Sequence, residues 1–231
     1  MKMMKIIVVG HGMVGHKFLE EMHQLQVPGV HVTVLCEEPR PAYDRVHLSE
    51  FFAGKSADDL SLVAPDFFEQ SGFELRLNTR VASIERRNKT LTTQDGEILA
   101  YDKLVLATGS SPFVPPVRGN DRERCFVYRT IEDLQAMAAA GAISRSGVVV
   151  GGGLLGLECA KALRDLGLQT HVVEFAPRLM TVQVDDEGGR ILRNKIEALG
   201  VHVHTSRNTT EIINGATAHH RMVFADGTHL E

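Results

Sequence analysis

Short β-branched runs, each followed by a glycine-rich turn and a helical pattern, occur twice along the chain. Residues 6–9 form an apolar run that ends at Gly10, and residues 148–150 form a second one that ends at Gly151. After each turn, apolar residues recur at three- and four-residue spacing, which is typical of an amphipathic helix. A further apolar run follows each helix and ends in an acidic residue. The pattern predicts two strand–helix–strand units, which form parallel sheets covered by helices.

Between these repeats the chain changes to short strand-like segments separated by turn residues. Alternation and turn signals of this kind indicate a small antiparallel meander. Its expected strands lie at residues 75–77, 81–84, 90–93 and 98–101. A buried strand is expected at residues 103–107.

The remaining elements follow from capping and amphipathic patterns. Thr130 begins a capping box and a helix that extends through Ala140. A second amphipathic helix is expected over residues 185–199, then a strand over 201–204 and one arm of a hairpin over 221–230. The chain ends just after that turn, and we expect a C-terminal truncation there. The predicted fold is α/β, with two Rossmann-like three-layer dinucleotide-binding lobes and a small antiparallel β-meander.

Composition narrows the functional classes. The 231 residues contain 25 Lys and Arg against 29 Asp and Glu, a formal charge of −4, which argues against a broad electrostatic grip on nucleic acid. No apolar run approaches the roughly 18 residues that cross a membrane. The apolar run near the N-terminus is too short for a signal peptide. We therefore expect a cytoplasmic protein.

Cysteine and histidine positions favour neither a disulfide scaffold nor a metal site. Cys36, Cys125 and Cys159 are widely spaced and odd in number, so they indicate buried residues rather than a redox dithiol or an iron–sulfur ligand set. His202 and His204 alternate on one expected strand, but no cysteine or carboxylate set stands at ligand spacing. No metal ligand is predicted.

The first glycine-rich turn has the G-x-G-x-x-G spacing of a dinucleotide site. Gly10 permits the tight turn, Gly12 lets the backbone approach a pyrophosphate, and Gly15 allows close packing of helix on strand. The helix N-terminus then offers unpaired N–H groups to the anion. His11 occupies a variable position of the motif, and no specific role is assigned to it.

The second turn repeats this spacing with Gly151, Gly153 and Gly156. In each unit an acid stands where a ribose hydroxyl is bound in such folds, Glu37 in the first and Glu174 in the second. A carboxylate at Glu174 bonds a free 2′-hydroxyl and repels a 2′-phosphate, which favours NADH over NADPH.

Two dinucleotide folds in one chain resemble the FAD- and NAD(P)-binding pyridine nucleotide-disulfide oxidoreductase superfamily. Residues 104–110 are similar to that family's A-T-G segment, which passes close to FAD. Residues 36–49, 125–134 and 151–158 resemble the N-terminal reductase portion of bacterial NADH-dependent nitrite reductase large subunits.

The resemblance implies a role for each candidate residue. It divides the chain into an FAD-binding domain over residues 1–114, lacking its last segment, and an NAD(P)H-binding domain over 115–231. For FAD, it assigns the pyrophosphate to Gly10, Gly12 and Gly15, the adenosine ribose to Glu37, and other contacts to Arg45, Val81, Thr108 and Gly109. For NADH, it assigns the pyrophosphate to Gly151, Gly153 and Gly156, the ribose to Glu174, and the surroundings of the nicotinamide amide to Glu158. Two alternatives stay open, a solvated loop arginine at Arg45 and a helix-dipole acid at Glu158.

The activity implied is hydride transfer from NADH to FAD, with electrons passed on to a siroheme and [4Fe-4S] centre in an absent C-terminal portion that reduces nitrite to ammonia. A small nitrite reductase subunit and a homodimer are the implied partners. No residue is assigned a catalytic proton transfer. The chain lacks the cysteine pair of disulfide reductases, and Glu50 stands where rubredoxin and ferredoxin reductases often carry lysine. Such a reductase, or a non-catalytic dinucleotide-binding module, remains the alternative. We expect the chain alone to bind FAD weakly and to leave nitrite unreduced.

Overall fold

The computed structural model describes residues 3–231 and divides them into two compact units. The first unit holds the described residues up to His47 together with Ser56–Ser111, and the second holds Leu48–Lys55 together with Pro112–Glu231. The chain therefore leaves the first unit at Leu48, returns to it at Ser56 and leaves it again at Pro112. The boundary expected between residues 114 and 115 and the cofactor assigned to each side stay a prediction.

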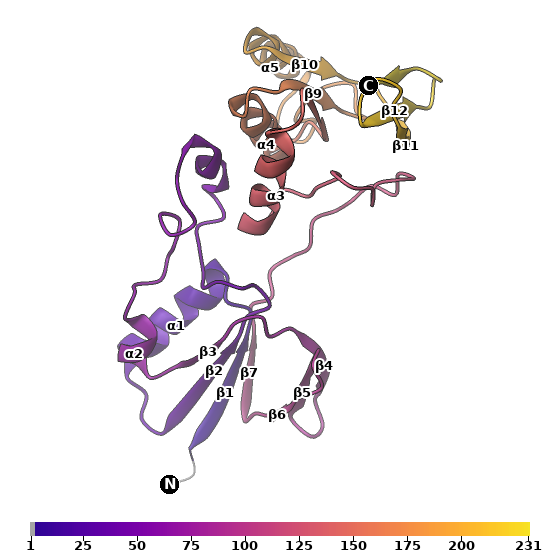
Figure 1. The fold of residues 1–231 in the computed structure, drawn as a ribbon. Helices are drawn as coiled ribbons and strands as arrows, with labels where there is room; N and C mark the ends of the chain where they lie inside the picture. Colours follow the sequence, from indigo (N-terminus) through magenta and orange to yellow (C-terminus); the bar gives the residue numbers. More distant parts are fainter. Residues whose placement is uncertain (1–2) are drawn as a thin grey trace. The chain divides into compact units, whose positions relative to one another are not determined.

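A four-stranded parallel sheet forms the centre of the first unit (Figure 1). Its strand order is β3-β2-β1-β7, and helix α1 connects β1 to β2. The elements are β1 (Met4–Val9), α1 (Met13–Leu25), β2 (Val30–Leu35), β3 (Glu74–Arg76) and β7 (Lys103–Leu106). The predicted first strand–helix–strand unit is confirmed.

One strand expected in the meander belongs to this sheet instead. β3 pairs in parallel with β2, and the antiparallel meander consists only of β4 (Val81–Glu85), β5 (Thr90–Thr93) and β6 (Ile98–Ala100). β3 has only three residues, all half-buried, so it shows no alternation of apolar and polar positions that could identify its partner strand. The contact that fixes β3 is distant in sequence, since the Thr33 hydroxyl donates to the Glu74 carboxylate at 3.0 Å.

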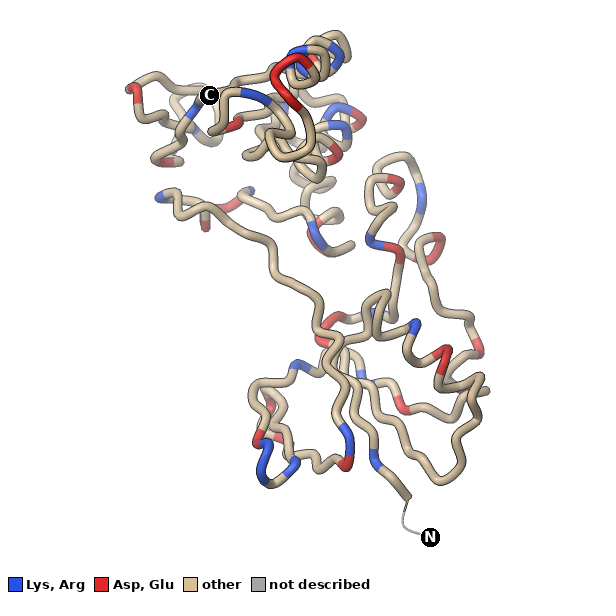
Figure 2. Tube along the Cα trace, turned by 180° about the vertical axis from the view of Figure 1, so that it is seen from behind, with Lys and Arg blue, Asp and Glu red and all other residues tan. Residues whose placement is uncertain are grey.

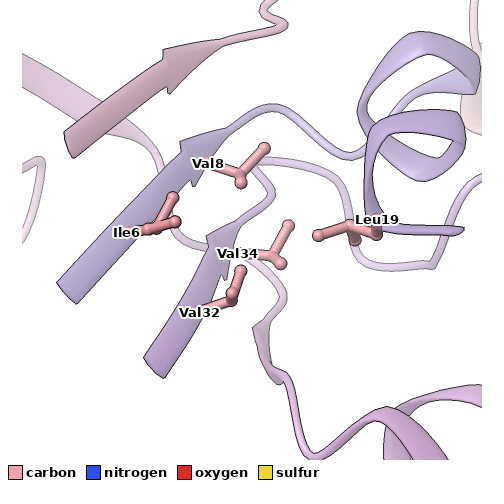
Figure 3. Close-up of a cluster of buried hydrophobic side chains, with 5 residues drawn as sticks. All are labelled: Ile6, Val8, Leu19, Val32 and Val34. Carbon is pink, nitrogen blue, oxygen red and sulfur yellow. The ribbon is translucent and has the colours of Figure 1, made fainter. Parts of the chain in front are cut away.

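Alternate side chains of β1 and β2 point to opposite faces of the sheet, as the pleat requires. Ile6, Val8, Val32 and Val34 pack with Leu19 of α1 (Figure 3). Ile7, Val9 and Leu35 pack on the other face with Leu91 of the meander. The first unit is thus a helix layer, a parallel sheet and a β-meander layer. The short helix α2 (Phe67–Ser71) adds Phe67 and Phe68 to the helix side.

The second unit repeats the arrangement with a three-stranded parallel sheet of order β10-β9-β8. Its elements are β8 (Ser146–Val150), α4 (Leu154–Asp165), β9 (Gln169–Val173), α5 (Asp186–Ala198) and β10 (Val201–His204). An antiparallel sheet packs Met222 and Phe224 against Val173. That sheet consists of β11 (Thr209–Asn214), β12 (His220–Phe224) and β13 (His229–Leu230).

Two further helices complete the second unit. Helix α3 (Ile131–Gly141) begins with the expected capping box between Thr130 and Asp133, and Asp185 caps α5. The short helix η1 (Leu48–Ala53) lies against α3 and α4. Figure 2 shows basic and acidic residues interspersed along both units. Over residues 3–231, none of the helices is both long enough and apolar enough to span a membrane.

Candidate functional site

The first glycine turn joins β1 to α1, and two of its glycines are required by close backbone contacts. Gly10 has a φ of +100°, and a Cβ on it would lie 2.3 Å from the carbonyl oxygen of Ala107. A Cβ on Gly15 would lie 2.2 Å from the carbonyl oxygen of Gly10. Side chains at either position would separate the helix, the turn and the end of β7. Gly10 therefore permits the tight turn and Gly15 the close approach of the helix, while their contact with a dinucleotide stays a prediction.

Gly12 differs because a Cβ there would meet nothing within 4 Å. It is the N-cap of α1, no side chain caps this end, and no acid lies in the first turn. The first-turn N–H groups and the positive end of the helix dipole therefore face open space, which suits a pyrophosphate. The residues present fit the phosphate part of a dinucleotide.

The acids that follow β2 are placed differently from each other. Glu37 is 64 % exposed, and its carboxylate lies 3.6 Å from the Arg80 guanidinium. Glu38 is half-buried, accepts a hydrogen bond from the Tyr43 hydroxyl at 2.7 Å and forms an ion pair with Arg45. The Arg45 guanidinium also stacks over the Tyr43 ring, 4.6 Å from its centroid. Arg45 is thus held in a half-buried network rather than lying as a solvated loop side chain.

Thr108 and Gly109 lie at the same end of the sheet as the first glycine turn. The Ala107 N–H donates to the Val9 carbonyl oxygen at 2.8 Å, so the chain continues past β7 alongside the end of β1. Thr108 and Gly109 then emerge exposed, with a φ of +68° at Gly109. Val81 begins β4 and packs against the core on the meander side. Its expected contact with adenine stays a prediction.

The second glycine turn joins β8 to α4 and reproduces the first in its main features. Gly151 has a φ of +112°, and a Cβ on Gly156 would lie 2.0 Å from the Gly151 carbonyl oxygen. Gly153 is the N-cap of α4, and a Cβ there would meet nothing within 4 Å. No side chain caps this helix and no acid lies in its first turn. A second phosphate site of the same type therefore fits here.

Glu174 binds the backbone of this turn directly. Its carboxylate accepts the Gly152 N–H at 2.6 Å through Oε2 and the Ala176 N–H at 2.7 Å through Oε1. The loop also returns to the turn, because the Met180 N–H donates to the Gly152 carbonyl oxygen at 3.0 Å and the fully buried Leu179 lies beneath Gly152. Each carboxylate oxygen keeps a lone pair that a ribose hydroxyl can use.

Arg178, the nearest basic residue after Glu174, is engaged within its own loop. Its guanidinium pairs with Asp186 at 2.7 Å and donates to the Val184 carbonyl oxygen at 3.2 Å. These contacts direct the charge to the start of α5. Arg178 is thus paired with Asp186, whereas Glu174 is the charged side chain that binds the glycine turn.

Glu158 is half-buried on α4, two residues after Gly156. Burial, together with the nearby Cys159 and Glu158, raises the pKa of the Tyr128 hydroxyl. Glu158 thus lies within electrostatic reach of Tyr128, and its expected place beside a nicotinamide amide stays a prediction.

Two buried histidines at the first turn were not assigned a function from the sequence. His11 and His16 are each 4 % exposed, and their ring centroids are 5.4 Å apart. Burial and the neighbouring His16 lower the pKa of His11 to about 4. The sequence signal that could have identified His11 is its place between the motif glycines Gly10 and Gly12. In the part of the chain that the structure describes, no three His, Cys, Asp or Glu side chains are grouped so that they could hold a metal ion.

Comparison with known proteins agrees with this geometry. The family model described as pyridine nucleotide-disulphide oxidoreductase matches residues 4–231. The chain is 50 % identical over 233 residues to the NADH nitrite reductase large subunit of Escherichia coli K12, covering 100 % of the chain and 28 % of that protein. It is 56 % identical over 230 residues to the NAD(P)H nitrite reductase large subunit of Klebsiella oxytoca, covering 97 % of the chain and 24 % of that protein. The chain thus spans about a quarter of these relatives.

Among solved structures, a ferredoxin reductase from Rhodopseudomonas palustris superposes with a TM-score of 0.89 at 27 % sequence identity. The match covers 98 % of this chain and 56 % of that one. It confirms the predicted α/β architecture.

Proposed function

The chain belongs to the pyridine nucleotide-disulphide oxidoreductase family, and we propose that it is a flavoprotein reductase module that passes a hydride from NADH to FAD. One observation carries the proposal. Each unit presents an uncapped helix N-terminus to open space, formed by Gly12 in one and Gly153 in the other. The family relationship supplies the redox class of the ligands.

In the first unit, the proposal gives the FAD pyrophosphate to the turn of Gly10, Gly12 and Gly15. Glu37 is exposed and accepts hydrogen bonds from the adenosine ribose, while Arg45 is oriented toward FAD by Glu38 and Tyr43. The remaining FAD contacts in the proposal are Val81, Thr108 and Gly109. The bound flavin supplies the chemistry, since it accepts a hydride and releases single electrons.

In the second unit, the proposal gives the NADH pyrophosphate to the turn of Gly151, Gly153 and Gly156. Glu174 accepts a hydrogen bond from the ribose 2′-hydroxyl, and Glu158 lies beside the nicotinamide amide. No side chain needs to exchange a proton with the substrate in a hydride transfer, so the protein's task is to bind and orient the two nucleotides.

Preference for NADH over NADPH is part of the proposal and is supported by the contacts of Glu174. Two backbone N–H groups fix its carboxylate, and Arg178 is occupied with Asp186. A 2′-phosphate would meet the fixed negative charge at close range.

Fluorescence titration of the chain with NADH and NADPH tests this preference. We expect tighter binding of NADH and a smaller difference between the two nucleotides in Glu174→Ala. Glu37→Ala is the matched control and should leave the ratio unchanged. Tighter binding of NADPH by the unmodified chain would show that the role given to Glu174 is wrong.

Onward electron transfer is proposed from the names of the two nitrite reductase relatives. The reduced flavin would serve a siroheme and [4Fe-4S] centre outside these 231 residues, for reduction of nitrite to ammonia. A small nitrite reductase subunit, a homodimer and a cytoplasmic location belong to the same proposal. The structural match to a ferredoxin reductase favours one second candidate, an NADH reductase for a ferredoxin- or rubredoxin-type carrier.

Flavin spectroscopy tests the reductase proposal. FAD added to the chain should bind weakly and bleach when NADH is added, while nitrite stays unreduced. Nucleotide binding without any flavin binding would instead favour a non-catalytic module. Reduction of a ferredoxin or rubredoxin by the flavin-loaded chain would favour the second candidate.

A further inference from the structure

His11 joins the first glycine turn to the loop that follows β2. Its Nδ1 accepts a hydrogen bond from the Ala42 N–H at 3.1 Å. Both partners are buried, with His11 4 % and Ala42 2 % exposed. An N–H donor buried this deeply needs an acceptor, because leaving it unpaired costs far more than an average hydrogen bond gains. The imidazole thus supplies the acceptor that attaches residues 36–47 to the turn.

The same loop carries the arginine that the proposed function places along FAD. Tyr43 follows Ala42 directly, is 3 % exposed and donates its hydroxyl proton to Glu38. Glu38 forms the ion pair with Arg45, and Arg45 stacks on the Tyr43 ring. A displacement of Ala42 would therefore move the three side chains of this network together.

We propose that His11 is a positioning residue that fixes the loop of Glu38, Tyr43 and Arg45 against the glycine turn by accepting the Ala42 N–H on Nδ1. The inference rests on the proposed function, since it assigns His11 to FAD binding through the loop. His11 does so only with Nδ1 unprotonated and the proton on Nε2, a buried atom that has no hydrogen-bond partner among the described residues. An imidazolium would place an N–H opposite the Ala42 N–H and break the contact.

The surroundings of His11 favour this neutral form. The rings packed on it are His16 from α1 and Phe68 from α2, and the Cys36 thiol that follows β2 lies beside the His11 backbone N–H. None of these is an anion at neutral pH. Burial and His16 keep the pKa of His11 near 4, so the acceptor is present at physiological pH.

Two substitutions separate the acceptor from the volume of the ring. His11→Asn places Oδ1 close to the position of Nδ1 and retains an acceptor, whereas His11→Leu fills space without one. His229→Leu is the control, because His229 is exposed on β13. Two properties are measured on the full chain, namely hydrogen exchange of the Ala42 amide and the dissociation constant for added FAD.

In His11→Leu, we expect the Ala42 amide to exchange at least about tenfold faster and FAD to bind about 10- to 100-fold more weakly, as for loss of one buried acceptor. In His11→Asn, both values should stay within about threefold of the unmodified chain. Equal Ala42 exchange and equal FAD binding in His11→Leu would overturn the proposal, and so would a folded His11→Asn that behaves like His11→Leu.

The design separates failure of this inference from failure of the proposed function. If the unmodified chain binds no FAD at any concentration, the proposed function fails, while Ala42 exchange still reports on the attachment. If His11→Leu does not fold, the Ala42 protection factor is compared between the unmodified chain and His11→Asn from pH 6.5 to 4.5. Protection should fall only in the unmodified chain, and a parallel fall in both would overturn the role of His11.

Discussion

The two units place the same glycine turn against the loop after the second strand, but they fasten the loop in opposite ways. In the first unit the residue between the first two motif glycines is His11, and its side chain accepts a hydrogen bond from the backbone of Ala42. In the second unit that residue is Gly152, and side chains of the loop contact it instead. Glu174 binds the Gly152 N–H, and Leu179 fills the space where a Cβ would be, 2.5 Å away.

This difference changes what each acid is available to do. Glu37 is exposed and, among the residues that the structure describes, its ion pair is with Arg80, so a ligand can take up most of its hydrogen-bonding capacity. Glu174 already accepts two backbone N–H groups and is fixed before any nucleotide arrives. The acid thus also holds the turn together in the second unit, where the motif residue is glycine, and not in the first, where it is histidine.

The largest loss of stability should come from replacing the third motif glycine, which has the same close backbone contact in both units. Gly15→Ala and Gly156→Ala each place a methyl group within about 2 Å of a backbone oxygen that cannot move without breaking the turn. We expect each to lower the free energy of unfolding by about 3 kcal/mol, at the upper end for overpacking. Urea denaturation followed by circular dichroism measures the loss. A loss below about 0.5 kcal/mol in either variant would show that the helix can shift away from its strand.

Acid should weaken the first unit through His11. Because folding lowers its pKa from 6.5 to about 4, the stability that His11 contributes is complete above pH 6.5 and is lost as the pH falls toward 4. The full difference between these two pKa values corresponds to about 3 kcal/mol of the free energy of unfolding. Urea denaturation at several pH values measures the loss, which should be smaller in His11→Asn. The second unit has its own buried histidine, His171, whose pKa is also lowered to about 4, so part of the acid sensitivity should remain in that variant.

Removing the two acids should have unequal consequences for stability. Glu174→Ala leaves the N–H of the buried Gly152 without its acceptor, and we expect a loss of about 2 kcal/mol. Glu37→Ala removes an exposed ion pair and should change stability by less than about 0.5 kcal/mol. The two variants are compared by thermal and urea unfolding. Equal losses would contradict the distinction between a structural and a free acid.

The smallest effect on folding should come from the two helix N-caps. Gly12→Ser and Gly153→Ser place a side chain in open space and supply a capping oxygen, so we expect a gain of a few tenths of a kcal/mol. The same side chain occupies the space proposed for the pyrophosphate, and nucleotide affinity should fall by at least about tenfold. Unfolding and nucleotide titration are measured on the same samples. Unchanged affinity would place the phosphate elsewhere.

Sequence patterns were sufficient for the features that depend on neighbours along the chain. The two glycine turns, the helix cap at Thr130 and the acid after each second strand all follow from local spacing. Contacts between distant segments were not predictable in this way. The pairing of β3 with β2, the attachment of Ala42 to His11 and the ion pair of Glu38 with Arg45 each depend on how a loop returns to the sheet. A loop of this type has no periodicity that fixes its path.

The excursion of Leu48–Lys55 means that the second unit is not one continuous stretch of sequence. η1 carries the buried Leu48 and lies against α3 and α4, although the chain on both sides of it belongs to the first unit. A fragment beginning at Pro112 would lack this helix and expose the surface beneath it. A single cut between Ser111 and Pro112 would leave η1 on the N-terminal piece and its binding surface on the C-terminal piece. Reassembly of the second unit from the two pieces would then require η1 to bind in trans.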